Sequence, residues 1–380
     1  MRVGIPKEVF PGETRVALIP ESVKKLTDKK AEVVIESGAG AVAGCSDEAY
    51  QAVGAKVERS HDAVLGADLV LKIQPPAAGE DGLPNEVAAL KQGAALITFL
   101  QPFARRALLT KLAERNVTAM SMEMVPRISR AQNMDALSSM ATVAGYKAVL
   151  LAANAFARFF PMFMTAAGTI APARALILGA GVAGLQAIAT AKRLGAIVEA
   201  FDTRPVVKEQ VESLGARFAE LGLETKDAED KSGYAKGQSE EFYRKQQQIM
   251  SKYVTNADVV IPTALVPGQR APVLITEEMV RGMRPGSVIV DLAAEQGGNC
   301  AITEPGKEIV RHGVVIIGPV NLPSTVPFHA SEMYAKTVTN YLAHLLKEGR
   351  VHLDLDDELT RGPLVTHQGE ILYEAVKTTL

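Results

Sequence analysis

The strongest constraint on the fold is the segment at residues 175–202, ALILGAGVAGLQAIATAKRLGAIVEAFD. A short apolar run leads into a G-x-G-x-x-G pattern with glycines at Gly179, Gly181 and Gly184, and a helix-like stretch and a second apolar run follow. In a strand–turn–helix unit, the first glycine permits the tight turn, the second lets a pyrophosphate approach, and the third lets the helix pack against the strand. The segment therefore predicts dinucleotide binding; the alternative is a turn that serves only the fold.

The second apolar run ends at Asp202, where a carboxylate in such a unit binds the ribose hydroxyls. A carboxylate at this place repels the 2′-phosphate of NADP, so Asp202 favours NAD. Arg204 points the other way, because an arginine nearby can hold that phosphate.

The remaining pattern predicts an α/β fold with two Rossmann-like, doubly wound parallel-sheet domains flanking a cleft. A chain of 380 residues is long enough for two domains. Apolar runs of strand length alternate with amphipathic helical stretches, which is typical of parallel sheets covered on both faces. The predicted strands are at 3–5, 32–36, 68–73, 95–100, 118–123, 175–178, 196–201, 258–261, 287–291 and 314–318, and the predicted helices are at 21–30, 104–115, 134–158 and 329–347.

We expect an N-terminal domain at residues 1–137 that is completed by residues 327–380, and a dinucleotide-binding domain at residues 138–326. Inside the second domain, residues 224–241 contain no Val, Ile, Leu, Met or Phe. Such a stretch buries too little apolar surface to fold alone, so it is either an inert insertion or a mobile lid at about 222–242.

Composition excludes several functions. Lys and Arg (41) do not exceed Asp and Glu (43), so the chain lacks the basic excess of a nucleic-acid-binding protein. The 2 cysteines and 6 histidines form no metal-ligand spacing, so no metal site is predicted. The first residues lack the apolar core of a signal peptide, and the most apolar stretch, 159–173, is too short and too rich in proline to span a membrane. These features predict a soluble chain.

That apolar stretch predicts a β-hairpin at 161–173 with Gly168 in the turn. It is too apolar to remain in water, so it packs either against its own chain or against another subunit.

A polar cluster at residues 127–138, RISRAQNMDALS, precedes the predicted long helix. One interpretation is helix capping by Ser129 or Asn133. The other is that Arg127, Gln132, Asp135 and Ser138 orient the carboxamide of a nicotinamide at the cleft.

These motifs resemble the alanine dehydrogenase superfamily, and within it the NAD(H)-binding component of proton-translocating NAD(P)+ transhydrogenases. The resemblance covers nearly the whole chain. It is carried by RVGIPKE, GETRVALIPE, VPRISRAQNMDALSS, GAGVAGLQAIATAKRLGA, SGYAKGQSEEF, TALVPGQRAPVLI and DLAAEQGGN.

The resemblance implies that Arg127, Gln132, Asp135 and Ser138 hold the nicotinamide for transfer, and that Tyr234 belongs to a mobile loop. It further implies contacts to the rest of NAD(H) from a larger set. These are Ile128, Ser129, Asn133, Met134, Gly179, Gly181, Val182, Ala183, Gly184, Asp202, Thr203, Arg204, Gly233, Gln246 and Leu265.

The implied activity is hydride transfer between NADH on this chain and NADP+ on a separate NADP(H)-binding component, coupled to proton translocation by membrane-spanning subunits. The resemblance also implies a homodimer, for which the 161–173 hairpin is the candidate contact, and a cytoplasmic chain held at the inner face of the membrane by its partners.

Two other functions stay open. An alanine dehydrogenase needs a proton-handling histidine after strand 95–100, whereas this chain has Gln101, which cannot act as an acid or base. Arg15 and Lys72 match residues that grip the substrate carboxylate in alanine dehydrogenases. The third possibility is a non-catalytic NAD(H) sensor whose 127–138 cluster only caps a helix.

Overall fold

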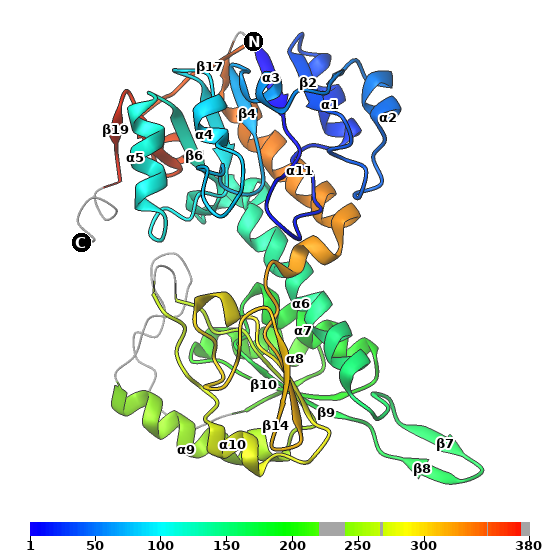
Figure 1. Cartoon of the computed structure of the whole chain (residues 1–380). Helices are drawn as coiled ribbons and strands as arrows, with labels where there is room; N and C mark the ends of the chain where they lie inside the picture. The colour runs from blue at the N-terminus through cyan, green and yellow to red at the C-terminus, as the bar shows by residue number, and fades with distance from the viewer. Residues whose placement is uncertain (220–239, 267–268, 348, 374–380) are drawn as a thin grey trace. The chain divides into compact units, whose positions relative to one another are not determined.

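The computed structural model describes residues 1–219, 240–266, 269–347 and 349–373 (Figure 1). The chain divides into two compact units. Unit 1 consists of Met1–Met140 with Pro323–Leu380, and unit 2 consists of Ala141–Leu322.

Unit 1 is built from short strands that alternate with helices, as the apolar pattern of the sequence predicts. In chain order its N-terminal portion contains β1 (Arg2–Ile5), α1 (Pro20–Thr27), β2 (Glu32–Glu36), α2 (Asp47–Ala52), β3 (Lys56–Glu58), α3 (His61–Leu65), β4 (Leu69–Leu71), α4 (Glu86–Ala89), β5 (Ala95–Thr98), α5 (Arg106–Glu114), β6 (Thr118–Ser121), η1 (Met122–Met124) and η2 (Ser129–Met134). Its C-terminal portion contains α11 (Pro327–Leu345), β16 (Leu346–Lys347), β17 (Arg350–Val351), α12 (Glu358–Arg361), β18 (Leu364–His367) and β19 (Glu370–Ile371). The short helix η5 (Leu322–Thr325) precedes α11.

The sheet of unit 1 has the strand order β19-β18-β6-β5-β4-β1-β2-β3. Strands β1 to β6 are parallel, and their order reverses between β1 and β4, as in doubly wound folds. The C-terminal strands β18 and β19 extend the sheet, with β18 antiparallel to β6 and β19 antiparallel to β18. Helix α11 was predicted to return to this unit, but the two added strands were not predicted.

Unit 2 contains the glycine-rich segment. Its elements are β7 (Phe163–Thr165), β8 (Gly168–Ile170), β9 (Arg174–Leu178), α7 (Val182–Arg193), β10 (Ile197–Phe201), η3 (Pro205–Val207), α8 (Lys208–Ser213), β11 (Arg217–Phe218), α9 (Glu240–Asn256), β12 (Val259–Pro262), α10 (Glu277–Gly282), β13 (Val288–Val290), η4 (Ala294–Gln296), β14 (Glu308–Arg311) and β15 (Val314–Ile317). Helix α6 (Ala136–Ala155) begins before the unit boundary and ends inside unit 2.

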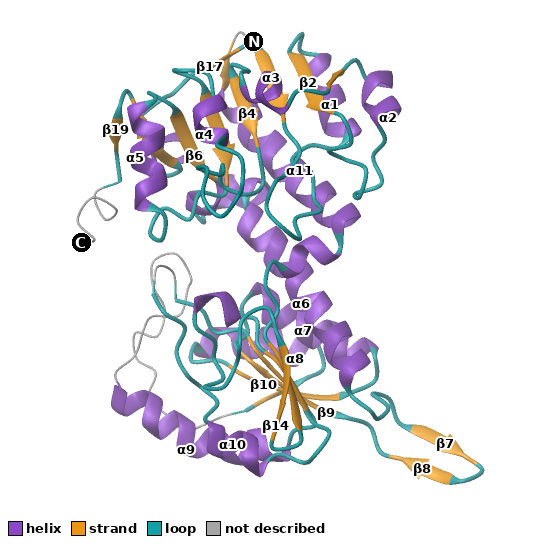
Figure 2. Cartoon of the chain, in the orientation of Figure 1, coloured by secondary structure: helices purple, strands orange, loops and turns teal. Residues whose placement is uncertain are grey.

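The main sheet of unit 2 has the order β11-β10-β9-β12-β13-β15-β14, parallel except for the edge strand β14. Neighbouring residues of β9 enter apolar cores on opposite faces of the sheet. Ile177 packs with α6, α7 and α8, whereas Leu176 packs with α9 and α10. Helices therefore cover both faces, which confirms the predicted doubly wound α/β fold (Figure 2).

Helix α6 is long and apolar enough, by length and composition, to cross a membrane, and the described portion of the chain contains no second helix of this kind. One such helix is weak evidence, because a core helix passes the same test. Ala148, Val149 and Ala152 of α6 are fully buried in the core of unit 2, so packing accounts for that composition. The prediction that 159–173 is the most apolar stretch overlooked this helix.

The predicted hairpin is confirmed, although Gly168 lies just after the turn and not in it. Strands β7 and β8 pair antiparallel from Phe163–Ile170 to Thr165–Gly168, so Gly168 (φ +112°) directly follows the two-residue turn. Every residue of both strands is exposed, and Met164 is 79% exposed. Figure 1 shows the hairpin projecting from unit 2. The two strands therefore do not pack against the rest of unit 2, and the interpretation that the hairpin packs against its own chain is wrong for this unit.

A buried charge network lies beside the point where the strand order of the unit 1 sheet reverses. The Lys72 ammonium, which has no exposed surface, lies 3.0 Å from Glu8 and 2.9 Å from Glu86. His61 joins the same network, because its ring nitrogens lie 2.6 Å from Glu36 and 3.1 Å from Glu86. These hydrogen bonds to Glu36 and Glu86 raise the pKa of His61 to about 9.

We predict that the loss of stability in His61→Gln is largest below about pH 6.5 and fades as the pH rises to about 9. Because the folded protein holds the His61 proton more tightly than the unfolded chain, this contribution is complete below the unfolded pKa of about 6.5 and is lost as the pH rises through about 9. The shift corresponds to at most roughly 3 kcal/mol. Urea unfolding of both proteins from pH 6 to pH 10 measures this; a difference in unfolding free energy that does not shrink with pH contradicts it.

Candidate functional site

The glycine-rich loop has the geometry that its sequence predicts. Gly179 has a φ of +101°, and a Cβ there would lie 2.5 Å from the Thr263 hydroxyl. A Cβ on Gly184 would lie 1.8 Å from the Gly179 carbonyl oxygen, so only glycine allows α7 to begin this close to β9. In contrast, the nearest atom to a Cβ on Gly181 would be Arg204 at 3.9 Å, which leaves open space above that backbone.

The first turn of α7 offers backbone N–H groups beside this open space. The helix begins at Val182, its N-cap is Gly181, and no side chain caps it. Val182 and Ala183 are only partly buried. Uncapped N–H groups and the positive end of the helix dipole suit a phosphate, so the loop fits the pyrophosphate of a dinucleotide.

Asp202 lies just after the neighbouring strand β10 and contacts the loop. Its carboxylate accepts hydrogen bonds from the backbone N–H of Ala180 (2.7 Å) and from Arg204, whose Nε and Nη2 lie 2.9 Å from it. Asp202 therefore contacts the glycine-rich loop, and Arg204 is its ion-pair partner. Thr203 lies between them and is partly buried.

Two residues that the sequence did not single out shape the same edge of the sheet. The Thr263 hydroxyl donates to the carbonyls of Leu178 and Gly179, after β12. The buried side chain of Asn299 bonds both the N–H and the C=O of Ala264, which precedes the partly buried Leu265. Both residues fall in motifs of the resemblance, TALVP and QGGN, which were the available signal.

Helix α6 contacts the first turn of α7 through Gly145. A Cβ on Gly145 would lie 2.1 Å from the carbonyl oxygen of Ala183 and 3.0 Å from its Cα. The backbone of the nucleotide loop therefore rests directly on α6.

The polar cluster of unit 1 is organised by Asp135. Its carboxylate accepts from the Ser138 backbone N–H (2.7 Å) and from the Ser138 hydroxyl (2.6 Å), which caps the start of α6. Arg127 lies 3.7 Å from the same carboxylate and 3.4 Å from the Ser138 hydroxyl. Arg127, Asp135 and Ser138 thus form one cluster, and the expectation that Ser129 or Asn133 caps the helix is wrong.

Gln132 and Asn133 lie on η2, and the structure leaves their side chains exposed. Within the described ranges, the Gln132 side chain makes no hydrogen bond, so it is available to a ligand. The other predicted contacts of this segment are exposed at Ser129 and partly buried at Ile128 and Met134.

Three predicted residues lie wholly or in part outside the described residues. Gly233 and Tyr234 lie outside the described residues, as does most of the predicted mobile loop. Gln246 lies on α9, but its side chain is likewise outside the description.

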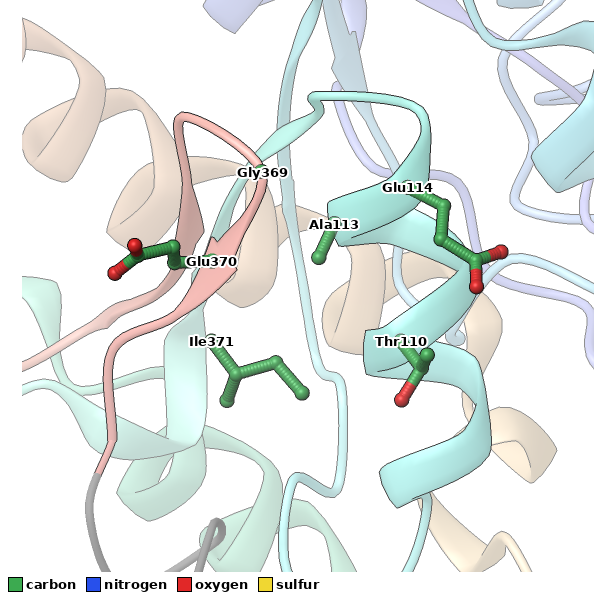
Figure 3. A pocket seen from close by; sticks show the side chains of 6 residues that line it. All are labelled: Thr110, Ala113, Glu114, Gly369, Glu370 and Ile371. Carbon is green, nitrogen blue, oxygen red and sulfur yellow. The ribbon is translucent and has the colours of Figure 1, made fainter.

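Two surface hollows of unit 1 lie away from these residues. One, of about 430 Å³, is lined by Thr110, Ala113, Glu114, Gly369, Glu370 and Ile371 (Figure 3). A larger one, of about 1100 Å³, lies at the amino ends of β1, β2 and β4, whereas ligands of doubly wound folds bind at the carboxyl ends. The described portion of the chain also has no group of three or more His, Cys, Asp or Glu suited to a metal ion.

Two family models match almost the whole chain. Residues 4–144 match the N-terminal domain of alanine dehydrogenase/PNT, and residues 148–374 match its C-terminal domain. The chain belongs to the alanine dehydrogenase/PNT family.

Within this family the chain is more similar to the transhydrogenases below than to the alanine dehydrogenase compared with them. It is 51% identical over 380 residues to an NAD(P) transhydrogenase subunit alpha of Rhodospirillum rubrum, with 99% of each chain covered. It is 30% identical to alanine dehydrogenase of Bacillus subtilis, covering 100% of this chain and 95% of that one. A transhydrogenase structure from Sinorhizobium meliloti superposes with a TM-score of 0.85 at 40% identity, covering 99% of this chain and 100% of that chain.

We predict that Gly145→Ala weakens NADH binding by roughly tenfold, because the new methyl group pushes the first turn of α7 away and such overpacking costs about 1–3 kcal/mol. Isothermal titration with NADH measures the affinity. Gly66→Ala is the matched control, since its Cβ would meet the nearest atom at 3.4 Å. Equal affinities in both variants would show that the contact with Ala183 does not matter for binding.

Proposed function

We propose that this chain is the NAD(H)-binding component of a proton-translocating NAD(P)+ transhydrogenase. The observation that carries the proposal is the 51% identity to a transhydrogenase subunit alpha over 99% of both chains, against 30% to alanine dehydrogenase. The reaction is NADH + NADP+ → NAD+ + NADPH, with NADP(H) bound by a partner component. Membrane-spanning subunits translocate the proton and hold this chain at the inner, cytoplasmic face.

The residues of unit 2 fit the adenosine and pyrophosphate half of NAD(H). The pyrophosphate lies at the open backbone of Gly181 and the first N–H groups of α7, and Asp202 receives the ribose hydroxyls. The carboxylate of Asp202 disfavours a 2′-phosphate, which supports NAD(H) over NADP(H). Its ion pair with Arg204 reduces this repulsion, but the same pair engages the Arg204 guanidinium with Asp202. Thr203, Arg204, Leu265, Gly233 and Gln246 complete the proposed contacts.

The 127–138 segment is proposed to hold the nicotinamide. Bound NADH supplies the hydride. Because no proton is transferred in that step, the chain needs no catalytic acid or base. Gln132 offers an amide donor and acceptor that match a carboxamide. Arg127, Asp135 and Ser138 hold one another in place and keep the 127–138 segment polar. The remaining contacts of this segment come from Ile128, Ser129, Asn133 and Met134. Orientation of this kind lowers a barrier without reacting groups.

Particular contacts weigh against an alanine dehydrogenase. At the position that needs a proton-handling group, Gln101 accepts a hydrogen bond from Arg105 at 3.0 Å and has no group that ionises near neutral pH. The two cations that match a carboxylate grip are paired inside unit 1: Arg15 with Glu13 at 2.6 Å, and Lys72 with Glu8 and Glu86.

The decisive experiment mixes this chain with a purified NADP(H)-binding transhydrogenase component and follows hydride transfer from NADH under single-turnover conditions. We expect transfer that requires both proteins. NADH oxidation by pyruvate and ammonia without the partner would instead identify an alanine dehydrogenase. Tight NADH binding with neither activity would identify a sensor.

We predict that Gln132→Asn slows hydride transfer about tenfold or more and leaves the NADH dissociation constant within about twofold. Shortening the side chain by one methylene withdraws the amide from the ring while the rest of the dinucleotide stays bound, and small misplacements are costly in transfer reactions. Gln51→Asn, at an exposed position on α2, is the control. Parallel losses of rate and affinity would mean that Gln132 serves binding alone.

We also propose that the chain is a homodimer that pairs through the hairpin at 161–173. The base of the hairpin is anchored, since Phe160 and Ala173 are buried and share a backbone hydrogen bond of 3.0 Å. On the hairpin and just before it, several large apolar side chains are exposed to solvent, namely Phe159, Met162, Phe163, Met164 and Ile170, and the ring centroids of Phe159 and Phe163 lie 4.6 Å apart. An apolar patch on a projecting arm is typical of a subunit contact.

We predict that Met164→Asp shifts the protein toward monomers and weakens dimerisation at least about tenfold, because burial of a methionine is worth about 1.5–3 kcal/mol and the new charge must be desolvated. Size-exclusion chromatography with light scattering at several concentrations measures this. Val310→Asp, on the edge strand β14 and 58% exposed, is the control. A dimer that resists the first change, or dissociates with the second, removes the hairpin as the contact.

A further inference from the structure

The helix η2, which carries Gln132 and Asn133, is too short to hold its own position. It spans six residues, Ser129–Met134, as a 3-10 helix without a side-chain cap. Helices of this type have weak internal hydrogen-bond geometry and are used only in short pieces. Its place in unit 1 must therefore come from contacts with other elements.

The first of these contacts is an ion pair from the C-terminal portion of the chain. The guanidinium of Arg130 donates to both carboxylate oxygens of Asp357, from Nη2 at 2.7 Å and from Nη1 at 3.1 Å. Two parallel hydrogen bonds fix direction as well as distance. The bond from Arg130 lowers the pKa of Asp357 to about 2, so the pair stays charged at any working pH.

Asp357 is itself held in place. Its carboxylate accepts a hydrogen bond of 3.0 Å from the backbone N–H of Leu359 and so caps α12. After α12, the carbonyl of Pro363 accepts from the backbone N–H of Ser121, and β18 pairs with β6. Because β6 leads into η1 and η2, the chain on both sides of the Arg130–Asp357 pair belongs to one sheet.

The second contact comes from α11. The side-chain amide of Asn340 donates a hydrogen bond of 2.9 Å to the backbone carbonyl of Asn133, the residue next to Gln132. Thus η2 is fixed at Arg130 by Asp357, the N-cap of α12, and at Asn133 by α11. Neither contact uses a residue of the Arg127–Asp135–Ser138 cluster.

We propose that Asp357 and Asn340 are positioning residues that fix Gln132 for hydride transfer. The inference rests on the proposed function. Arg130 is 56% exposed at its side chain, and exposed ion pairs contribute little to folding stability. Displacement of a positioning group by about 1 Å can nevertheless cost as much as about a hundredfold in rate. The contacts therefore matter more for transfer than for folding.

The test uses Asp357→Asn, Arg130→Gln, the double variant and Asn340→Ala in the full chain, mixed with the NADP(H)-binding component. Asparagine is also a good helix N-cap, so Asp357→Asn keeps the cap on α12 while it weakens the pair with Arg130. We expect single-turnover transfer to fall about tenfold in each single variant, while the NADH dissociation constant changes less than about twofold. Asp357→Asn and Arg130→Gln disrupt the same ion pair. The variant that carries both changes should therefore be no slower than the slower of the two single variants.

A second readout does not depend on transfer. Amide hydrogen exchange of residues 127–134 should be faster in these variants, with exchange in unit 2 unchanged. The control is Glu32→Gln, which breaks the exposed Lys56–Glu32 pair of 2.8 Å on the same unit and should alter neither measurement. Asp357→Glu, which restores the carboxylate, should recover some of the rate.

Unchanged transfer and exchange in the variants, beside an active unaltered chain, would overturn this inference and leave the proposed function intact. Equal losses of rate, NADH affinity and thermal stability would also overturn it, since they indicate a structural role only. An unaltered chain without any transfer would overturn the proposed function, and the positioning role with it.

Discussion

The close approach of Gly184 to Gly179 is the contact on which the arrangement of unit 2 depends. With no side chain at Gly184, α7 begins against the end of β9 and points its first N–H groups toward the carboxyl edge of the sheet. That edge is where the strand order reverses between β9 and β12, and Asp202 and Thr263 meet the loop there. A larger residue at Gly184 would disturb the whole set.

Helix α6 adds a second constraint of the same kind. Its small residues let it pack on the sheet of unit 2, and Gly145 brings it onto the backbone of Ala183. The apolar composition that makes α6 resemble a membrane span is thus the composition that close helix packing requires. Beyond those buried positions, Asp135 and Ser138 at its first turn give the helix a polar start.

The elements that could be predicted from the sequence are those whose apolar pattern extends over enough residues to be recognised, or whose glycines have a fixed spacing. Strand and helix alternation, α6 and the glycine loop belong here. Strands β16, β17 and β19 were not predicted because each has only two residues, too few to show alternation. The capping residue was missed because it depends on where α6 begins: Ser129 and Asn133 precede Asp135, but only Asp135 lies next to Ala136.

The chemistry of unit 1 follows from how its charges are paired. Lys72 and Arg15 are neutralised by glutamates of their own unit, and Arg130 is held by Asp357. The groups that remain available on η2 include the neutral amide of Gln132, which can orient a ring but cannot act as an acid or base. A hydride transfer between two nicotinamides requires orientation and no proton. The part of unit 1 around η2, with its cations held in ion pairs and the Gln132 amide available, is therefore suited to that reaction. It is poorly suited to a dehydrogenase that must exchange a proton with its substrate.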